Sequence, residues 1–200
     1  MKPHNLIGSL IVAALVSTTA FAQGSTPATN ASLRGVRAAE LGFGFVNPNH
    51  SSLNVYATNL GVNVPVSANV DLGAALTYGW VEANSDVDTT DLSVSATVYQ
   101  DFAQVRAFAA VSLGYAWLPG ALDDDWIWGA RVGAEFDLGS RFTTVLSAGY
   151  DDSFDNGSDG AFDGTVRLNY RATDKLLPYV EVSNIEGGDW GAALGVAYAF

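Results

Sequence analysis

The sequence predicts an all-β fold: a transmembrane antiparallel up-and-down β-barrel of about ten strands, with eight as the alternative, after a cleaved signal peptide. Three observations predict it. Large apolar residues alternate with small or polar residues, with period two, over many short stretches. Aromatic residues gather at both ends of these stretches, and aliphatic residues lie between them. After the N-terminal segment no uninterrupted apolar run reaches about 18 residues, which excludes a helical membrane protein.

The N-terminus has the pattern of a secretory signal peptide. Lys2 supplies a positive start, residues 6–16 are apolar, and Ala20-Phe21-Ala22 is the small-x-small pattern after which signal peptidases cut. Residues 23–32 are rich in Thr, Ser, Ala and Pro and have no periodicity. We therefore expect a signal peptide over 1–22, a flexible periplasmic lead-in over 23–36 and a barrel over 37–200.

Composition excludes several classes of protein. The chain has no cysteine, which rules out disulfides, zinc–thiolate sites and cysteine nucleophiles. A net charge of −12 without a basic patch argues against binding to nucleic acid, whose phosphates the chain would repel. Only 15% of residues are charged and the mean hydropathy is +0.17, so the acidic residues do not indicate a disordered tail.

Ten stretches show strand-like alternation. In the third, Leu72, Leu76 and Trp80 share one face, and small or polar residues such as Asp71 and Thr77 share the other. Eight strands would remain if one weak pair of stretches, with the pair around 177–184 as the first candidate, were a loop. The ten expected strands are Arg37–Val46, Leu53–Val64, Asn69–Val81, Asp91–Tyr99, Val105–Trp117, Trp126–Phe136, Phe142–Tyr150, Phe162–Arg171, Leu177–Asn184 and Asp189–Phe200.

The connections differ between the two ends of these strands. Those after odd-numbered strands include the acidic stretches EANSDVDTT, LPGALDDD and DDSFDNGSDGA, whereas those after even-numbered strands, such as QDFAQ, are mostly short. One end of the strand set therefore carries 14 of the 21 acidic residues. An even number of strands places both termini on the side of the short turns.

Aromatic positions distinguish a membrane barrel from a soluble β-sandwich, which also alternates. A barrel in lipid needs amphipathic rings at both water–lipid boundaries, whereas a sandwich core has no reason to keep them at its ends. Phe136, Phe142, Tyr170, Tyr198 and Phe200 lie on the large-residue face at the short-turn end. At the acidic end the expected aromatic girdle is Tyr78, Trp80, Tyr115, Trp117, Trp126, Trp128, Tyr150 and Trp190, with Phe162 beside them.

The whole mature chain resembles the small, porin-like outer-membrane β-barrel proteins of Gram-negative bacteria. The signal peptide, the ten aromatic-flanked stretches and the closing segment DWGAALGVAYAF carry this resemblance. It implies an outer-membrane location with both termini in the periplasm and the acidic loops outside. It also implies contact with outer-membrane lipid and lipopolysaccharide, and with the barrel-assembly machinery. The family's assembly signal, read by that machinery, corresponds here to Asp189, Gly191, Leu194, Val196, Tyr198 and Phe200.

Charged residues on the small-residue face are the strongest local indication of function. We expect them to point into the lumen, where they form either a salt-bridged plug or a selectivity constriction. The plug is favoured, because rings of a single sign are missing. These lumen charges are Glu40, Asp71, Arg106, Arg131, Glu135, Arg167, Arg171 and Glu181.

Catalytic and metal sites are weakly supported. His50 with Ser51 or Ser52 could be part of a hydrolase triad, but the spacing of these residues does not match a known triad pattern. We therefore expect that the protein is not an enzyme and binds no cofactor. Acidic residues in DDSFDNGSDGAFD could share a divalent cation, although Phe154 occupies a position where the EF-hand template needs a ligand. The weak metal candidates are Asp151, Asp152, Asp155 and Asp159, with Asp163 nearby.

The sequence therefore predicts an integral membrane barrel with a structural role, or a narrow passive pore for small solutes. The alternative is a surface-binding or adhesion barrel that acts through its acidic loops, with divalent cations as a possible aid. A barrel hydrolase is the third possibility.

Overall fold

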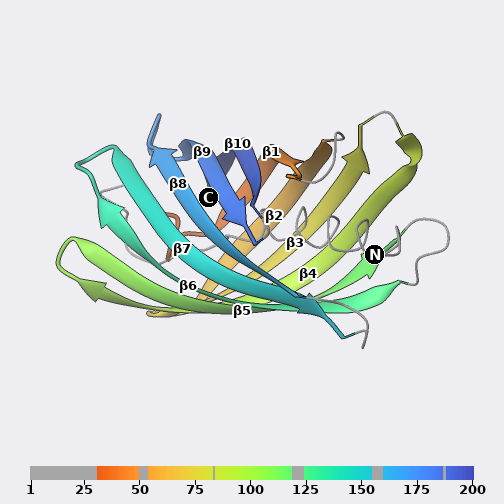
Figure 1. Cartoon of the computed structure of the whole chain (residues 1–200). Coiled ribbons are helices and arrows are strands. Elements are labelled where there is room, and N and C mark those ends of the chain that lie inside the picture. Colours follow the sequence, from red (N-terminus) through yellow and green to blue (C-terminus); the bar gives the residue numbers. More distant parts are fainter. Residues whose placement is uncertain (1–30, 50–53, 83, 119–123, 155–159, 187) are drawn as a thin grey trace.

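A computed structural model describes residues 31–49, 54–82, 84–118, 124–154, 160–186 and 188–200, with only the backbone described over 84–87. These residues form ten β-strands that enclose a lumen (Figure 1). Their bounds are β1 Ala38–Asn47, β2 Val55–Ser67, β3 Val70–Val81, β4 Asn84–Phe102, β5 Val105–Trp117, β6 Asp125–Asp137, β7 Phe142–Ser153, β8 Ala161–Tyr170, β9 Leu176–Ile185 and β10 Asp189–Ala199.

Every strand pairs antiparallel with its neighbours in the chain, and β1 closes the ring by pairing with β10 from Ala38↔Ala199 to Asn47↔Trp190. Closure leaves the described wall without a free strand edge, whose backbone amides lipid could not satisfy. The weak stretch near 177–184 is β9, which pairs with both β8 and β10. The predicted antiparallel up-and-down barrel is confirmed, with ten strands and not eight.

Strand β4 differs most from the expectation. It runs from Asn84 to Phe102, whereas the alternation predicted Asp91–Tyr99, so most of EANSDVDTT is strand and not loop. The hairpin continues because Trp80 pairs with Asp88 and Tyr78 with Thr90 before the register shifts near Val81. Polar side chains are compatible with strand pairing where a hairpin extends beyond a membrane, so hydropathy missed this extension.

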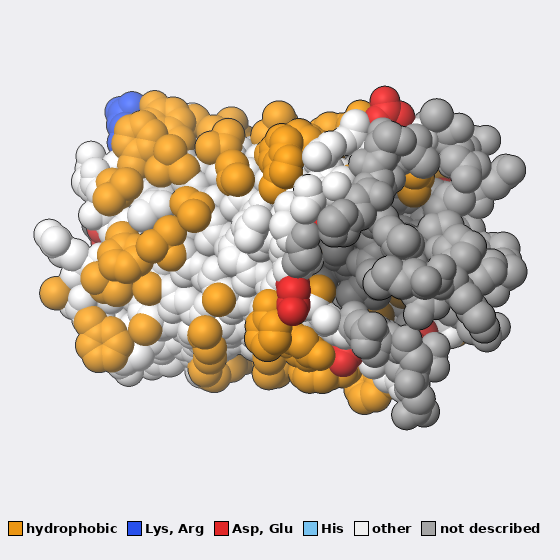
Figure 2. Space-filling model, viewed as in Figure 1, with side chains coloured by type: hydrophobic (Ala, Val, Ile, Leu, Met, Phe, Trp, Pro, Cys, Tyr) orange, Lys and Arg blue, Asp and Glu red, His pale blue; other side chains and the backbone are white. Residues whose placement is uncertain are grey.

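Burial alternates along each strand as the sequence pattern predicts. Outward-facing aliphatic side chains such as Val111 and Leu194 are about 60% exposed, whereas inward-facing Thr77 and Thr143 are fully buried. The molecule therefore has an apolar outer wall and a polar interior, the reverse of a water-soluble protein. Figure 2 shows hydrophobic side chains spread over the outer wall of the described barrel. No helix within the described ranges is long and apolar enough to cross a membrane.

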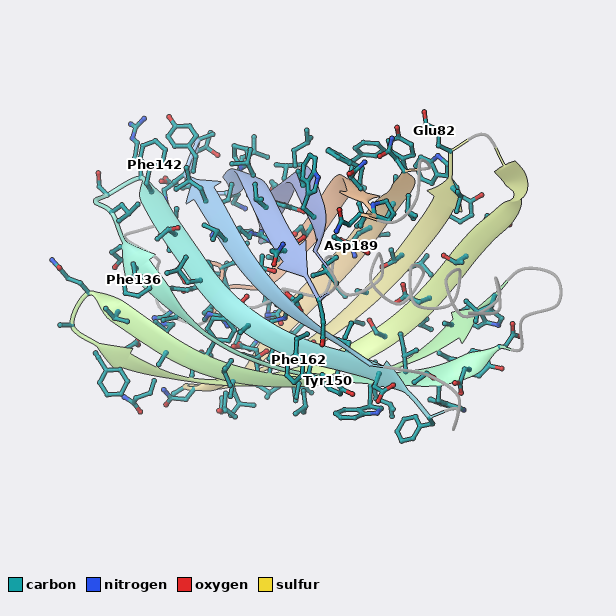
Figure 3. The ribbon with its side chains drawn as sticks, in the orientation of Figure 1. Glu82, Phe136, Phe142, Tyr150, Phe162 and Asp189 are labelled. Atoms are coloured by element: carbon teal, nitrogen blue, oxygen red, sulfur yellow. The ribbon has the colours of Figure 1, made fainter. Side chains whose placement is uncertain are left out.

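The two ends of the barrel differ. We call the end that holds the connections 68–69, 103–104, 138–141 and 171–175 the turn end, and the opposite end the loop end. The first residue of β1, Ala38, and the last residue of β10, Ala199, pair with each other at the turn end. Phe136 and Phe142 lie at this end in Figure 3, and Glu82 lies at the other. In Figure 2, Lys and Arg side chains show only at the turn end, and most Asp and Glu side chains lie toward the loop end.

Candidate functional site

The barrel interior is the candidate functional site, because the charged side chains of the strands gather there. Six of the eight expected lumen charges are buried to 7% exposure or less, namely Glu40, Asp71, Arg131, Glu135, Arg167 and Glu181. The other two, Arg106 and Arg171, are half-buried at the turn end. The buried arginines fall into three groups along the barrel.

The first group is centred on Arg167 of β8. Its two terminal nitrogens donate to the two carboxylate oxygens of Glu40 on β1, both at 3.0 Å, and its Nε donates to Asn169 Oδ1 at 2.8 Å. The guanidinium carbon lies 3.6 Å from the ring centroid of Tyr179. Glu181 pairs with Arg167 across the β8–β9 ladder. A bidentate pair with a stacked ring is the strongest arrangement that an arginine makes with a carboxylate.

The second group is centred on Arg131 of β6. Its terminal nitrogens donate to Asp163 of β8 at 2.6 and 2.9 Å, and Asp151 of β7 lies 3.9 Å away. Thr165 donates to Asp163 at 2.9 Å, and Arg131 also donates to the hydroxyl of Ser147 at 3.2 Å. The Asp163 side chain is completely buried, and Arg131 supplies the positive charge next to it.

The third group lies at the turn end. Glu135 of β6 binds Arg34 at 2.9 Å and accepts a hydrogen bond from Ser32 Oγ at 2.6 Å. Arg106 of β5 donates to the Arg34 carbonyl at 2.9 Å and is also paired with the carboxylate of Asp101. Arg34 and Ser32 precede the first strand, so part of the expected lead-in lies inside the barrel.

Three residues with prominent places in the lumen were not among the expected lumen charges. Asp163 and Asp91 were assigned to the acidic connections, yet Asp91 is 1% exposed and accepts a hydrogen bond from Thr77. The period-two alternation places both side chains in the lumen. Asp163, for example, shares a face with Thr165 and Arg167. Arg34 lies before the alternating region, and no sequence signal marked it.

Small cavities remain beside two of these groups. One, of about 20 Å³, is lined by Ser95, Ala110, Val111, Ser112, Gly129, Ala130, Arg131 and Asp151. Another, of about 10 Å³, lies beside Arg167 and is lined in part by Glu40, Asn59, Tyr179 and Glu181. A buried water needs about 10–15 Å³ of such volume and two or more polar partners, so each cavity has room for one water molecule.

The weak metal candidates do not converge where the structure describes them. Asp151 and Asp152 are consecutive on β7, so their side chains point to opposite faces of the wall. Asp151 lies near Arg131, whereas Asp152 accepts a hydrogen bond from the Tyr150 hydroxyl at 3.1 Å. Among the described residues no three acidic or histidine side chains are placed to hold a metal ion. Asp155 and Asp159 lie outside the described residues, as do His50, Ser51 and Ser52.

The aromatic residues expected at the acidic end form ring contacts near the loop end. Tyr78 and Trp80 stack at 5.8 Å, Tyr115 contacts both Trp117 and Trp126, and Trp128 lies 5.7 Å from Tyr150. Tyr150 also packs on Phe162, with ring centroids 4.7 Å apart. Figure 3 labels these two residues. The eighth ring, Trp190, packs edge-on against Phe45. All of these side chains are at least partly exposed and belong to the large-residue face of their strands.

The expected assembly signal coincides with β10, the strand that closes the ring. Leu194, Tyr198 and Phe200 point outward and are 47–61% exposed, and Val196 is partly exposed between them. On the other face Gly191 is buried, and Asp189 accepts a hydrogen bond from the Asn49 backbone at the loop end. The Phe200 backbone N–H donates to the Arg37 carbonyl at 3.0 Å.

A closed ring of ten antiparallel strands with a polar lumen and an apolar outer wall defines the class: the chain has the fold of the porin-like outer-membrane β-barrels. The translocator domain of the autotransporter NalP from Neisseria meningitidis is similar over 98% of this chain and 96% of its own, with 10% identity and a TM-score of 0.52. At this identity the similarity concerns the fold alone.

Two porins are less similar. The KdgM porin in complex with disordered oligogalacturonate covers 82% of this chain and 99% of its own at 9% identity, with a TM-score of 0.46. The NanC porin covers 82% of this chain and 100% of its own at 11% identity, also with a TM-score of 0.46. Comparisons with protein-family models and with curated proteins found no match.

Proposed function

We propose that the chain is an integral outer-membrane β-barrel of a Gram-negative bacterium. Its polar lumen is a structural core with room for no more than a narrow passive path for water and small solutes. The observation that carries the proposal is the pairing of an apolar outer wall with arginines bonded to carboxylates of other strands inside. We expect outer-membrane lipid and lipopolysaccharide to cover the wall, and the barrel-assembly machinery to insert the chain.

The outer wall supports the membrane part of this proposal. Large hydrophobic side chains such as Leu60, Val94, Val132 and Val180 are each more than half exposed. Burying apolar surface stabilises a protein by about 25 cal/mol per Å², so a wall of this kind is unfavourable in water. Contiguous exposed apolar surface on this scale is typical of a protein that contacts lipid.

The lumen supports the structural part. Arg34, Arg131 and Arg167 each bind a carboxylate directly, and both signs of charge occur together in each group. A selectivity filter usually has a ring of one sign, whereas mixed and mutually bonded charges hold strands together. Cavities with room for one water fit slow passage of water or small ions, and not an open channel.

Membrane fractionation with gel migration tests the proposal. The chain is expressed in a Gram-negative host, and the outer-membrane fraction is run with and without boiling. We expect the protein in that fraction, and we expect the unboiled band to migrate differently from the boiled band, because a closed barrel resists detergent until it is heated. A chain that stays soluble in buffer after export, and migrates identically in both lanes, would refute the proposal.

A further inference from the structure

The segment Ala31–Val36, which we call the plug segment, lies inside the turn end of the barrel just before β1. Its first four residues, Ala31 to Arg34, are 6% exposed or less. Ala31 and Leu33 pack with inward-facing apolar side chains of β1, β9 and β10, and Val36 packs against the same cluster. The wall residues of this cluster are Ala38, Leu177, Ala197 and Ala199.

The polar side chains of the plug segment reach the opposite wall. Ser32 Oγ donates to Glu135 of β6 at 2.6 Å, and Arg34 Nε lies 2.9 Å from the other oxygen of the same carboxylate. The Arg34 guanidinium also lies 3.3 Å from the ring centroid of Phe108 on β5. In the closed ring four strands separate β1 from β6 in either direction, so the segment crosses the full width of the lumen.

The other ion pairs do not cross the lumen in this way. Arg131 joins β6 to β8, and Arg167 joins β8 to β1, so these pairs link strands two and three places apart around the ring. These two pairs therefore connect nearby parts of the barrel wall. Among the ion pairs of the described residues, the Arg34–Glu135 pair alone joins opposite walls.

The backbone of the plug segment is also held in place. Arg106 donates to the Arg34 carbonyl at 2.9 Å and to Ser32 Oγ at 3.2 Å, and the Arg34 N–H donates to Ser32 Oγ at 3.1 Å. Gly35 has φ 84°, a left-handed conformation that glycine adopts without strain. This turn redirects the chain from the lumen into β1.

The charges at the turn end depend on whether the plug segment is present. Asp71 of β3 is 1% exposed and its two oxygens have no hydrogen-bond partner among the described residues, so burial disfavours its charged form and the charges of Arg34 and Arg106 offset that cost only in part. With the segment in place, two arginines face the carboxylates of Asp71, Asp101 and Glu135. Without it, Arg106 alone faces the same three carboxylates, so the part of the mouth that the segment covers loses one positive charge and Glu135 loses its arginine.

We propose that the plug segment closes the turn-end mouth of the lumen, with Arg34–Glu135 as its latch, and that its displacement opens a path that favours small cations. The proposal rests on the proposed function, because it requires a barrel in a membrane. Displacement of the segment uncovers the Glu135 carboxylate next to Asp71 without Arg34, and these uncovered carboxyl groups attract cations and repel anions.

Single-channel recording in planar bilayers tests the latch. Arg34→Gln removes the charge that binds Glu135, and Arg37→Gln is the matched control, because Arg37 is exposed and directly follows the plug segment. Removing one partner of a buried pair is strongly destabilising, so we expect Arg34→Gln to raise the fraction of time spent conducting about tenfold or more over the control. The reversal potential in a potassium chloride gradient should have the sign of a cation-selective path.

A disulfide lock provides the second variant. The chain has no cysteine, so Ala31→Cys with Ala197→Cys introduces one possible bridge, between two completely buried residues of the same cluster. We expect this variant to be silent when oxidised and to conduct, in intermittent openings, after reduction. It decides the question if Arg34→Gln fails to fold.

The outcomes separate the two proposals. Equal conduction by the two arginine variants, or by the oxidised and reduced forms of the locked variant, would overturn the proposal that the plug segment closes the lumen. The proposed function, a folded and heat-modifiable barrel, would still stand. An anion-selective current from Arg34→Gln would overturn the cation path. Failure of the unmodified chain to enter the membrane would overturn the proposed function itself.

Discussion

At the scale of single residues, the lumen places charges where each depends on a named partner. Arg167 and Glu40 come from β8 and β1, and both side chains are about 95% buried. A buried ion pair gains little over an apolar pair of similar volume, but breaking it leaves an uncompensated charge. Deleting one partner should therefore cost more than deleting both.

We expect Arg167→Met to lower the free energy of unfolding by about 3–5 kcal/mol, because the Glu40 carboxylate stays buried without its bidentate donor. Adding Glu40→Gln to that variant should recover part of the loss. Denaturant titration of the barrel in detergent micelles measures both. Arg141→Met, at an exposed turn position, is the control. Equal midpoints for Arg167→Met and Arg141→Met would contradict a stabilising role for the pair.

Glycines in the wall leave space for the buried charged side chains of the lumen. A Cβ at Gly149 of β7 would lie 2.8 Å from both the Arg131 guanidinium and the Asp163 carboxylate, whereas a Cβ at Gly164 of β8 would meet nothing within 4 Å. We expect Gly149→Ala to destabilise the barrel by about 1–3 kcal/mol through overpacking, and Gly164→Ala to be neutral or slightly stabilising. The same titration compares the two. A Gly149→Ala variant as stable as Gly164→Ala would show that the Arg131 group tolerates displacement.

At the scale of elements, period-two patterns were sufficient to predict nine strands closely, because a wall between lipid and a lumen imposes one side-chain type on each face. Strand β4 shows the limit of this reasoning. Beyond the apolar part of the wall both faces are polar, so alternation disappears while the ladder between Trp80 and Asp88 continues. Backbone pairing extends the hairpin there, and the hydropathy of the side chains does not predict this extension.

The closing strand β10 carries a prediction of its own. Phe200 is 61% exposed and contributes its backbone N–H to the ring, so its side chain adds little to the folded barrel. We expect Phe200→Ala to reduce the amount of barrel assembled in cells several-fold, and to change the unfolding free energy of purified barrel by about 0.5 kcal/mol or less. Phe142→Ala, another exposed phenylalanine at the turn end, is the control. Equal assembly of the two variants would argue against an assembly signal.

At the scale of the whole molecule, the sequence predicted which face is which, but not which charges meet. Parity places Glu40 and Arg167 in the lumen, yet only ring closure brings β1 close enough to β8 for them to bond. Arg34 was not predictable at all, because the lead-in has no periodicity and its burial depends on the width of the mouth that it crosses. Long-range geometry therefore determines the candidate site, and local pattern determines the wall around it.

The central claim is that large side chains at alternate positions face hydrocarbon and that their neighbours face the lumen. A nitroxide scan tests it most directly. Because the chain has no cysteine, Ala109, Ala110, Val111, Ser112 and Leu113 of β5 can each be replaced by a labelled cysteine in turn, with the barrel in lipid vesicles. We expect the accessibility of the label to oxygen to alternate, high at 109, 111 and 113 and low at 110 and 112. A flat profile, the opposite phase, or greatest access of a water-soluble nickel complex at 111 would contradict the account.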